Sequence, residues 1–204
     1  LLKRAIALSE KVLGPGHPDL ATDLSNLATL YVGQARYREA EALYRRGLSI
    51  DEKALGPNHV EVAIDLNNLA ALYRAQFRHG EAEPLYKRSL AIRKSVLGPD
   101  HPDVAQSYNN LAALYQSEGR HAEAEASYKR ALSIDQKAQG HDHPDVATGW
   151  NNLAMLYLDE GRVAEAEPLL KRSLSLREKV FGSSHPDVGT SLNNLEELYR
   201  AQDR

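Results

Sequence analysis

Residues 143–184 read HPDVATGWNNLAMLYLDEGRVAEAEPLLKRSLSLREKVFGSS, and this stretch decides the fold because it is one copy of a 42-residue pattern that fills the chain. Histidine recurs without a slip at positions 17, 59, 101, 143 and 185, and glycine recurs three residues before each of them. A fixed period of this length is typical of a solenoid, in which each unit buries its apolar face only against its neighbours. Such proteins usually work as binding surfaces.

The period divides the chain into full and partial copies. The full copies are residues 17–58, 59–100, 101–142 and 143–184. Residues 1–16 are predicted to be the second helix of a truncated repeat, and residues 185–204 the first helix of a further or terminal repeat. We therefore expect residues 1–204 to form a single array. Because the chain opens without Met, partway through a repeat, we also expect it to be a fragment of a longer protein.

Each period predicts two helices. In the third copy, apolar residues at three- and four-residue spacing predict a first helix over about residues 102–118 and a second over about 122–138. Proline opens most first helices, where its missing N–H costs nothing. The histidine before it is expected either to cap the helix or to pack beside the incoming loop. Alanine is expected where helices touch closely, at positions 28, 70, 112 and 154 and at positions 40, 82, 124 and 166. The sequence thus predicts an all-α fold.

Composition excludes several classes of function. The net charge of −3 leaves no basic stripe that could exchange for the counterions of nucleic acid. No stretch approaches the roughly 18 apolar residues of a membrane span. Cysteine is absent, which suits a reducing compartment, so we expect a cytoplasmic protein that binds neither nucleic acid nor membrane.

The sequence also lacks the signatures of a metal site or a catalytic centre. Five of the eight histidines occur once per repeat, which places them much farther apart than one coordination shell, with its ligand bonds of about 2 Å, would allow. The Glu-Ala-Glu triplets place two carboxylates on different helix faces, so they predict surface charges beside Arg36, Arg78, Arg120 and Arg162. No phosphate loop, dinucleotide fingerprint, HExxH or nucleophile elbow is present. We expect no metal, no cofactor and no enzyme activity.

The order of large and small residues in the fourth copy resembles the tetratricopeptide repeat, through Trp150, Leu153, Ala154, Tyr157, Ala166, Leu170 and Ser173. The longer 42-residue form, with HPDVA at 101–105, LNNLA at 66–70 and EAEPLYKRSL at 81–90, resembles the kinesin light chain subfamily over all 204 residues. This resemblance implies a right-handed superhelical solenoid of antiparallel helix pairs. It also implies a concave groove lined by the first helix of each pair.

Helical geometry then suggests which side chains face that groove. Positions one, five and eight residues after Trp150, and their equivalents in other copies, are expected on the inner surface. The predicted peptide-binding residues are Ser25, Asn67, Arg74, Asn109, Gln116, Asn151, Asn193 and Arg200. The resemblance implies that Asn67, Asn109 and Asn151 bind peptide backbone, and an amide suits this role because it both donates and accepts hydrogen bonds. The adjacent asparagines at 26, 68, 110, 152 and 194 are expected to satisfy backbone groups between repeats instead.

The charge of the first helices bears on the ligand. They carry two basic residues, Arg74 and Arg200, and many acids, so we expect an extended protein segment that is not strongly acidic. Glu196 stands where earlier copies have alanine, and Leu1, Leu2 and Ile6 lack a first helix of their own, which predicts weak head-to-tail self-association. Two alternatives to peptide binding stay open: a structural spacer or self-association module, and a regulatory segment of a larger signalling protein.

Overall fold

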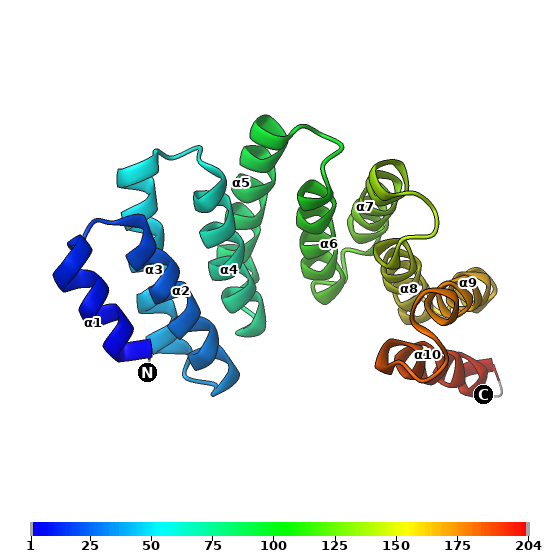
Figure 1. The fold of residues 1–204 in the computed structure, drawn as a ribbon. Helices are drawn as coiled ribbons and strands as arrows, with labels where there is room; N and C mark the ends of the chain where they lie inside the picture. Colours follow the sequence, from blue (N-terminus) through cyan, green and yellow to red (C-terminus); the bar gives the residue numbers. More distant parts are fainter. Residues whose placement is uncertain (1, 203–204) are drawn as a thin grey trace. The chain divides into compact units, whose positions relative to one another are not determined.

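The computed structural model describes residues 2–202 and divides the chain into two compact units, residues 1–99 and residues 100–204. The first unit contains α1 (Leu2–Leu13), α2 (Pro18–Gly33), α3 (Tyr37–Leu55), α4 (Val60–Ala75) and α5 (His79–Leu97). The second contains α6 (Pro102–Ser117), α7 (His121–Gln139), α8 (Pro144–Asp159), α9 (Val163–Phe181) and α10 (Pro186–Gln202). All ten elements found in the described residues are helices (Figure 1), so the all-α prediction is confirmed.

Consecutive helices pack against each other within each unit. In the first unit α2 contacts α3, α3 contacts α4 and α4 contacts α5, and the second unit repeats this order from α6 to α10. The alanines expected at close contacts in the first and second helices are all fully buried. One cluster in the first unit consists of Val62, Ala63, Leu66 and Ile92, with Leu48 and Leu85 packed against it. Its residues come from three successive helices, so the core continues from one helix pair into the next.

The helix starts follow the expectation for the recurring histidine. In α2, α4, α6, α8 and α10 its Nδ1 accepts a hydrogen bond of 3.1–3.2 Å from the backbone N–H two residues later. This bond satisfies one of the four N–H groups that the first turn of a helix leaves without a partner. Proline follows the histidine in most copies and an acid comes next, which suits the positive end of the helix dipole. The histidines are therefore helix caps.

Replacing His17 with alanine is expected to lower the free energy of unfolding by about 1 kcal/mol, because the N–H of Asp19 loses its acceptor at the start of α2. Urea denaturation followed by circular dichroism would measure the change. His17→Asn is the control, because asparagine is itself a good helix cap. If His17→Ala and the unaltered protein unfold at the same urea concentration, water satisfies the backbone N–H of Asp19 as well as the histidine does.

The turns between first and second helices contain one residue with a left-handed backbone. In the second unit this residue is Gly119 or Gly161, with φ of 72° and 71°, whereas Ala35 and Phe77 occupy it in the first unit, with φ of 56° and 58°. A left-handed backbone costs a non-glycine residue on the order of 1 kcal/mol. The first unit therefore stores strain at two turns where the second does not.

Phe77→Gly is accordingly expected to raise the free energy of unfolding by about 0.5–1 kcal/mol, since the phenyl ring is 82% exposed and little packing is lost. Thermal unfolding of the variant would show the gain. Ala91→Gly, at an exposed position inside α5, should instead lower stability by about 1 kcal/mol. Destabilisation by both changes would mean that the Phe77 ring contributes more than its exposure indicates.

Candidate functional site

The first-helix face is the solvent-exposed side of α2 and α4 in the first unit, and of α6, α8 and α10 in the second. In the first unit, Ser25 is half-buried and its Oγ donates to Asp65 Oδ1 on α4 at 3.1 Å. Asn67, two residues after Asp65 on α4, is also half-buried. These two predicted binding residues therefore lie at the border between the exposed face and the packed interior.

Arg74 is the last residue but one of α4, and its side chain is half-buried. Its Nε is buried and has no acceptor, while the guanidinium hydrogen-bonds to Tyr86 of α5. Burial raises the pKa of the Tyr86 hydroxyl, and the neighbouring arginine opposes that rise. The Arg74 side chain therefore contributes to packing between α4 and α5, and only part of it is available to a ligand.

In the second unit, two predicted binding residues connect successive first helices. Gln116 Nε2 on α6 donates to Asp159 Oδ2 on α8 at 2.5 Å, and Gln116 Oε1 accepts from the Tyr128 hydroxyl at 3.0 Å. Asn151 Oδ1 on α8 accepts from Asn194 Nδ2 on α10 at 2.7 Å. Both side chains are half-buried, so each presents only part of its amide to solvent.

The remaining predicted residues of the second unit differ in their freedom to bind. Asn109 Oδ1 is buried and receives no hydrogen bond. Asn193 is exposed, and Arg200 forms an exposed ion pair of 2.5 Å with Glu196 one turn earlier. Asn109 and Asn193 therefore have the most unused hydrogen-bonding capacity among the residues predicted in this unit.

The adjacent asparagine row is half-buried at positions 68, 110, 152 and 194. Asn26 is exposed, Asn110 Oδ1 accepts from Gln106, and Asn194 donates to Asn151. The structure brings Asn151 and Asn194 together, so the two rows act partly as one network.

Charged residues of the second helices also contact the first helices. These contacts were not predicted from the sequence, because only the charges on the first helices were considered. Arg177 of α9 is only 7% exposed, and its Nη1 donates to Ser191 Oγ on α10 at 2.8 Å. Its Nη2 lies 3.4 Å from Thr148 Oγ1 on α8. The sequence signal was a charged residue after a buried aliphatic one in each copy, at 51, 93, 135 and 177. We call the contacts between such a residue and the next first helix the seam.

A carboxyl pair occupies the seam of the first unit. Asp51 of α3 and Asp65 of α4 are each only 4% exposed, and their carboxyl groups lie within hydrogen-bonding reach of each other. Burial, followed by the adjacent Asp51 carboxyl, raises the pKa of Asp65 to about 7. Burial also raises the pKa of Asp51. This seam differs chemically from the arginine–serine seam formed by Arg177 and Ser191.

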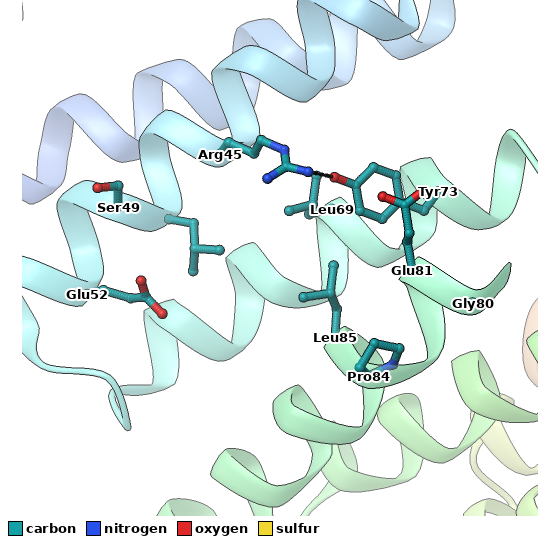
Figure 2. A pocket seen from close by; sticks show the side chains of 10 residues that line it. Arg45, Ser49, Glu52, Leu69, Tyr73, Gly80, Glu81, Pro84 and Leu85 are labelled. Carbon is teal, nitrogen blue, oxygen red and sulfur yellow. Dashed lines mark hydrogen bonds between the residues drawn. The ribbon is translucent and has the colours of Figure 1, made fainter. Parts of the chain in front are cut away.

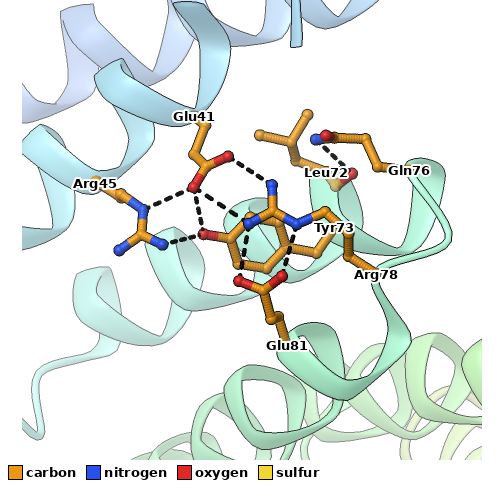
Figure 3. Close-up of polar contacts among 7 residues, drawn as sticks. All are labelled: Glu41, Arg45, Leu72, Tyr73, Gln76, Arg78 and Glu81. Carbon is orange, nitrogen blue, oxygen red and sulfur yellow. Dashed lines mark hydrogen bonds and ion pairs between the residues drawn. The ribbon is translucent and has the colours of Figure 1, made fainter. Parts of the chain in front are cut away.

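A recurrent cluster of glutamate, tyrosine and arginine joins consecutive helix pairs, and Figure 3 shows it in the first unit. Arg78 stacks on the ring of Tyr73, with its guanidinium carbon 4.1 Å from the ring centroid, and pairs with Glu41 of α3 at 2.6 Å. The Tyr73 hydroxyl donates to Glu41 Oε1 at 2.9 Å and accepts from Arg45 at 2.6 Å. We call Glu41, Tyr73 and Arg78 the clamp.

The second unit repeats the clamp with Glu125, Tyr157 and Arg162. Arg162 lies 4.0 Å from the Tyr157 ring centroid and 2.7 Å from Glu125, and the Tyr157 hydroxyl donates to Glu125 at 3.0 Å. Hydrogen bonds from Arg162, then from Lys129, lower the pKa of Glu125 to about 2. The second glutamate of each triplet is therefore half-buried between helix pairs and not the simple surface charge that was predicted.

The clamp predicts acid sensitivity. The lowered pKa of Glu125 means that its contribution to stability is complete above the unfolded-state value of 4.5 and is lost as the pH falls toward about 2. Since the group is partly exposed, we expect Glu125→Gln to remove only on the order of 1 kcal/mol at pH 7, and to flatten the pH dependence between pH 5 and 3. Urea denaturation at several pH values tests this. Glu123→Gln, at the exposed first glutamate, should leave that slope nearly unchanged.

A pocket of about 440 Å³ lies on the opposite side from the first-helix face, between α3 and α5 with α4 as its floor (Figure 2). Leu48, Leu69 and Leu85 give it an apolar lining. Pro84 has no N–H, so the Gly80 carbonyl at the rim lacks its usual helical donor. None of the predicted binding residues lines this pocket. Its charged rim residues already form internal ion pairs: Arg45 with Glu41, Glu52 with Arg88 and Glu81 with Arg78.

The described residues contain no group of three or more acids or histidines that could hold a metal ion. His143, one of the two histidines nearest each other in the sequence, caps α8. Within the same described part of the chain, no helix is long and apolar enough to cross a membrane.

Comparison with known proteins fits this helix-pair geometry. The tetratricopeptide repeat profile matches residues 1–53, 37–95, 62–137, 103–157 and 145–204. The chain belongs to the tetratricopeptide repeat family. Proteins built from tetratricopeptide repeats generally mediate protein–protein interaction, and this scaffold is typically non-enzymatic.

Solved structures similar to this tetratricopeptide repeat protein include kinesin light chain-like proteins. BtubC (BKLC) from P. vanneervenii is 28% identical, with a TM-score of 0.81 over 99% of this chain and 80% of that one. A kinesin light chain-like protein from Podosopora anserina, with nearly identical TPR-like repeats, is 28% identical, with a TM-score of 0.77 over 92% of this chain and 89% of that one. No curated protein sequence matches the chain. The resemblance predicted from the sequence is confirmed.

Proposed function

We propose that the chain binds an extended peptide segment of a protein partner along its first-helix face. The observation that carries the proposal is the recurrence of partly exposed amide side chains at one helical position, with Asn109 Oδ1 still lacking a donor. An unpaired buried acceptor costs about 1–3 kcal/mol, which a peptide N–H would recover after a small side-chain rotation. Amides bind backbone with little regard to sequence, so the ligand is defined mainly by being extended.

The ligand is a neutral or mildly basic segment. Of the two basic residues on the first helices, Arg74 is directed toward Tyr86 and Arg200 is paired with Glu196. The exposed acids include Asp19 and Glu61 in the first unit, and Asp103, Asp145, Asp159 and Glu197 in the second. An acidic peptide would meet net repulsion on either unit, which costs affinity and slows association. The absence of cysteine suits a cytoplasmic setting for this interaction.

A peptide-display selection tests the proposal. Peptides selected on the full chain would be counter-screened on the triple variant Asn67→Ala, Asn109→Ala, Asn151→Ala. The matched control changes three exposed residues of the second helices, with Lys53→Ala, Lys94→Ala and Ser133→Ala. We expect enriched peptides to lose binding only to the first variant. Enrichment that survives in both variants would place the binding surface elsewhere, and sub-micromolar affinity for a tryptophan-containing acidic peptide would contradict the proposed charge preference.

A second candidate function is weak self-association through the end helices. It is favoured by α1, on which Leu8 is 62% and Val12 is 69% exposed. These side chains lie one turn apart and form an apolar ridge. We expect the sedimentation-derived mass to rise with concentration, and Val12→Asp to prevent the rise. A mass that stays monomeric up to millimolar concentration would exclude this candidate in favour of peptide binding alone.

A further inference from the structure

The seam of the first unit contains two carboxyl groups that need a proton between them. Asp51 Oδ1 and Asp65 Oδ2 are both buried, and neither receives a hydrogen bond from a conventional donor. A carboxylate accepts but cannot donate, so the two groups can hydrogen-bond to each other only when one of them is protonated. With both ionised, the seam would hold two adjacent charges away from water and without a counter-ion, which is strongly unfavourable.

The groups around the pair do not neutralise it. On α2, the Ser25 hydroxyl donates to Asp65 Oδ1 at 3.1 Å and carries no charge. On α4, Glu61 acts on both carboxyls and favours their protonated forms. His59, which precedes α4, has a smaller opposite effect on Asp51 while its Nδ1 is engaged as a helix cap. No arginine or lysine is among the groups described as acting on either carboxyl.

Equivalent seams elsewhere are built differently. In the second unit, Arg177 meets Ser191. Asp135 of α7 is buried there, but the acid that acts on it, Asp145 of α8, is exposed, and Gln139 donates to both carboxyls. At the start of the first unit, Ser9 Oγ donates to Asp23 at 2.6 Å, which an ionised carboxylate accepts readily. Among the seams described within the units, only the one between α3 and α4 brings two buried acids together.

We propose that Asp51 and Asp65 form a proton-dependent latch between α3 and α4, closed while the pair shares one proton and loosened when both carboxyls ionise. This inference is independent of the proposed peptide binding. It has a consequence for that function, however, because Asn67 lies two residues after Asp65 on α4. Loosening the latch would displace the part of the first-helix face that carries Asn67.

The direction with pH follows from linkage. An unfolded aspartate titrates near pH 3.9. Because the folded seam holds its proton to a higher pH, its stability is greatest in acid, declines as the pH rises from about 4 to about 7, and then stays low. For a single group that titrates near pH 7 in the folded state, the opening equilibrium increases by about tenfold between pH 6 and pH 8.5.

Two measurements on the full chain test the latch. Carbon-13 NMR of the aspartate carboxyls, assigned with Asp51→Asn and Asp65→Asn, should show one carboxyl of the pair titrating near neutral pH. Titration of both in the ordinary acidic range would overturn the proposal. Hydrogen exchange of α3 and α4 amides, corrected for intrinsic rates, should show about tenfold less protection at pH 8.5 than at pH 6.

The chain itself supplies the replacement seam. The double variant Asp51→Arg, Asp65→Ser copies the Arg177–Ser191 contact, and its α3 and α4 protection should change by less than about twofold over the same pH range. Asp65→Asn provides a conservative second variant, should the double variant fold poorly, and it too should lose the pH dependence. Persistence of the full pH effect in Asp65→Asn, or neutral titration without any change in protection, would refute the latch.

Discussion

Ala154→Glu is expected to lower the free energy of unfolding of the second unit by at least about 3 kcal/mol. Ala154 is fully buried on α8, at one of the positions where the sequence predicts a close contact between helices. A glutamate there has to overpack the contact, at a cost of about 1–3 kcal/mol, and also bury a carboxylate that no partner faces. Circular dichroism during urea denaturation would measure the loss.

The chain contains its own control for this substitution. Glu196 occupies the equivalent position on α10, where its side chain is 60% exposed and paired with Arg200. We expect Glu196→Ala to change stability by no more than about 0.5 kcal/mol. If Ala154→Glu were equally mild, the close approach of helices at Ala154 would not exist in solution.

Leu156→Ala should cost about 2–5 kcal/mol, because Leu156 is completely buried and its removal leaves a cavity in the second unit. In a repeat array, stability is approximately the sum of local terms, so the loss should remain concentrated in the second unit. We therefore expect urea denaturation to separate into two transitions, with hydrogen exchange accelerating in α8 and α9 more than in α2 and α3.

Leu192→Ala is the matched control for Leu156→Ala, since Leu192 belongs to the same unit but is 50% exposed. It should cost less than about 1 kcal/mol. A uniform loss of protection across both units in Leu156→Ala would show that the chain unfolds as one cooperative body.

The helices were predictable because the 42-residue period repeats every relevant signal. The first helix of the third copy was predicted over about residues 102–118 and begins and ends at Pro102 and Ser117. The second was predicted over about 122–138 and spans His121–Gln139. Proline, histidine and glycine act on the backbone locally, so their positions fix helix ends without knowledge of the tertiary structure.

The side chains of the candidate site were harder to place. Helical geometry located Ser25 and Asn151 near the exposed face, but it could not show that each contacts the following first helix, through Asp65 and Asn194 respectively. That contact depends on the spacing between helix pairs, which is set by packing across repeats and not by the helix itself. The same reason explains why Arg177, a second-helix residue, was not expected beside Thr148.

The clamp was partly predictable. The arginine beside each Glu-Ala-Glu triplet was apparent from spacing, and the pair of Arg78 with Glu81 is a local contact three residues apart. The other partner of Arg78 is Glu41, which lies 37 residues earlier in the sequence, in the preceding helix pair. Only the fold brings these two residues together.

The difference between clamp and seam limits how the chain can be recombined. The clamp uses the same three residue types in both units, so it would form again in a chimera of any two copies. The seam does not, because Asp51 is matched to Asp65 and Arg177 to Ser191. A segment exchanged between copies should therefore start with a second helix and include the first helix that follows, such as α3 with α4, and not the pair that the sequence period suggests. Duplication or shuffling in that frame keeps Asp51 together with Asp65, and Arg177 together with Ser191.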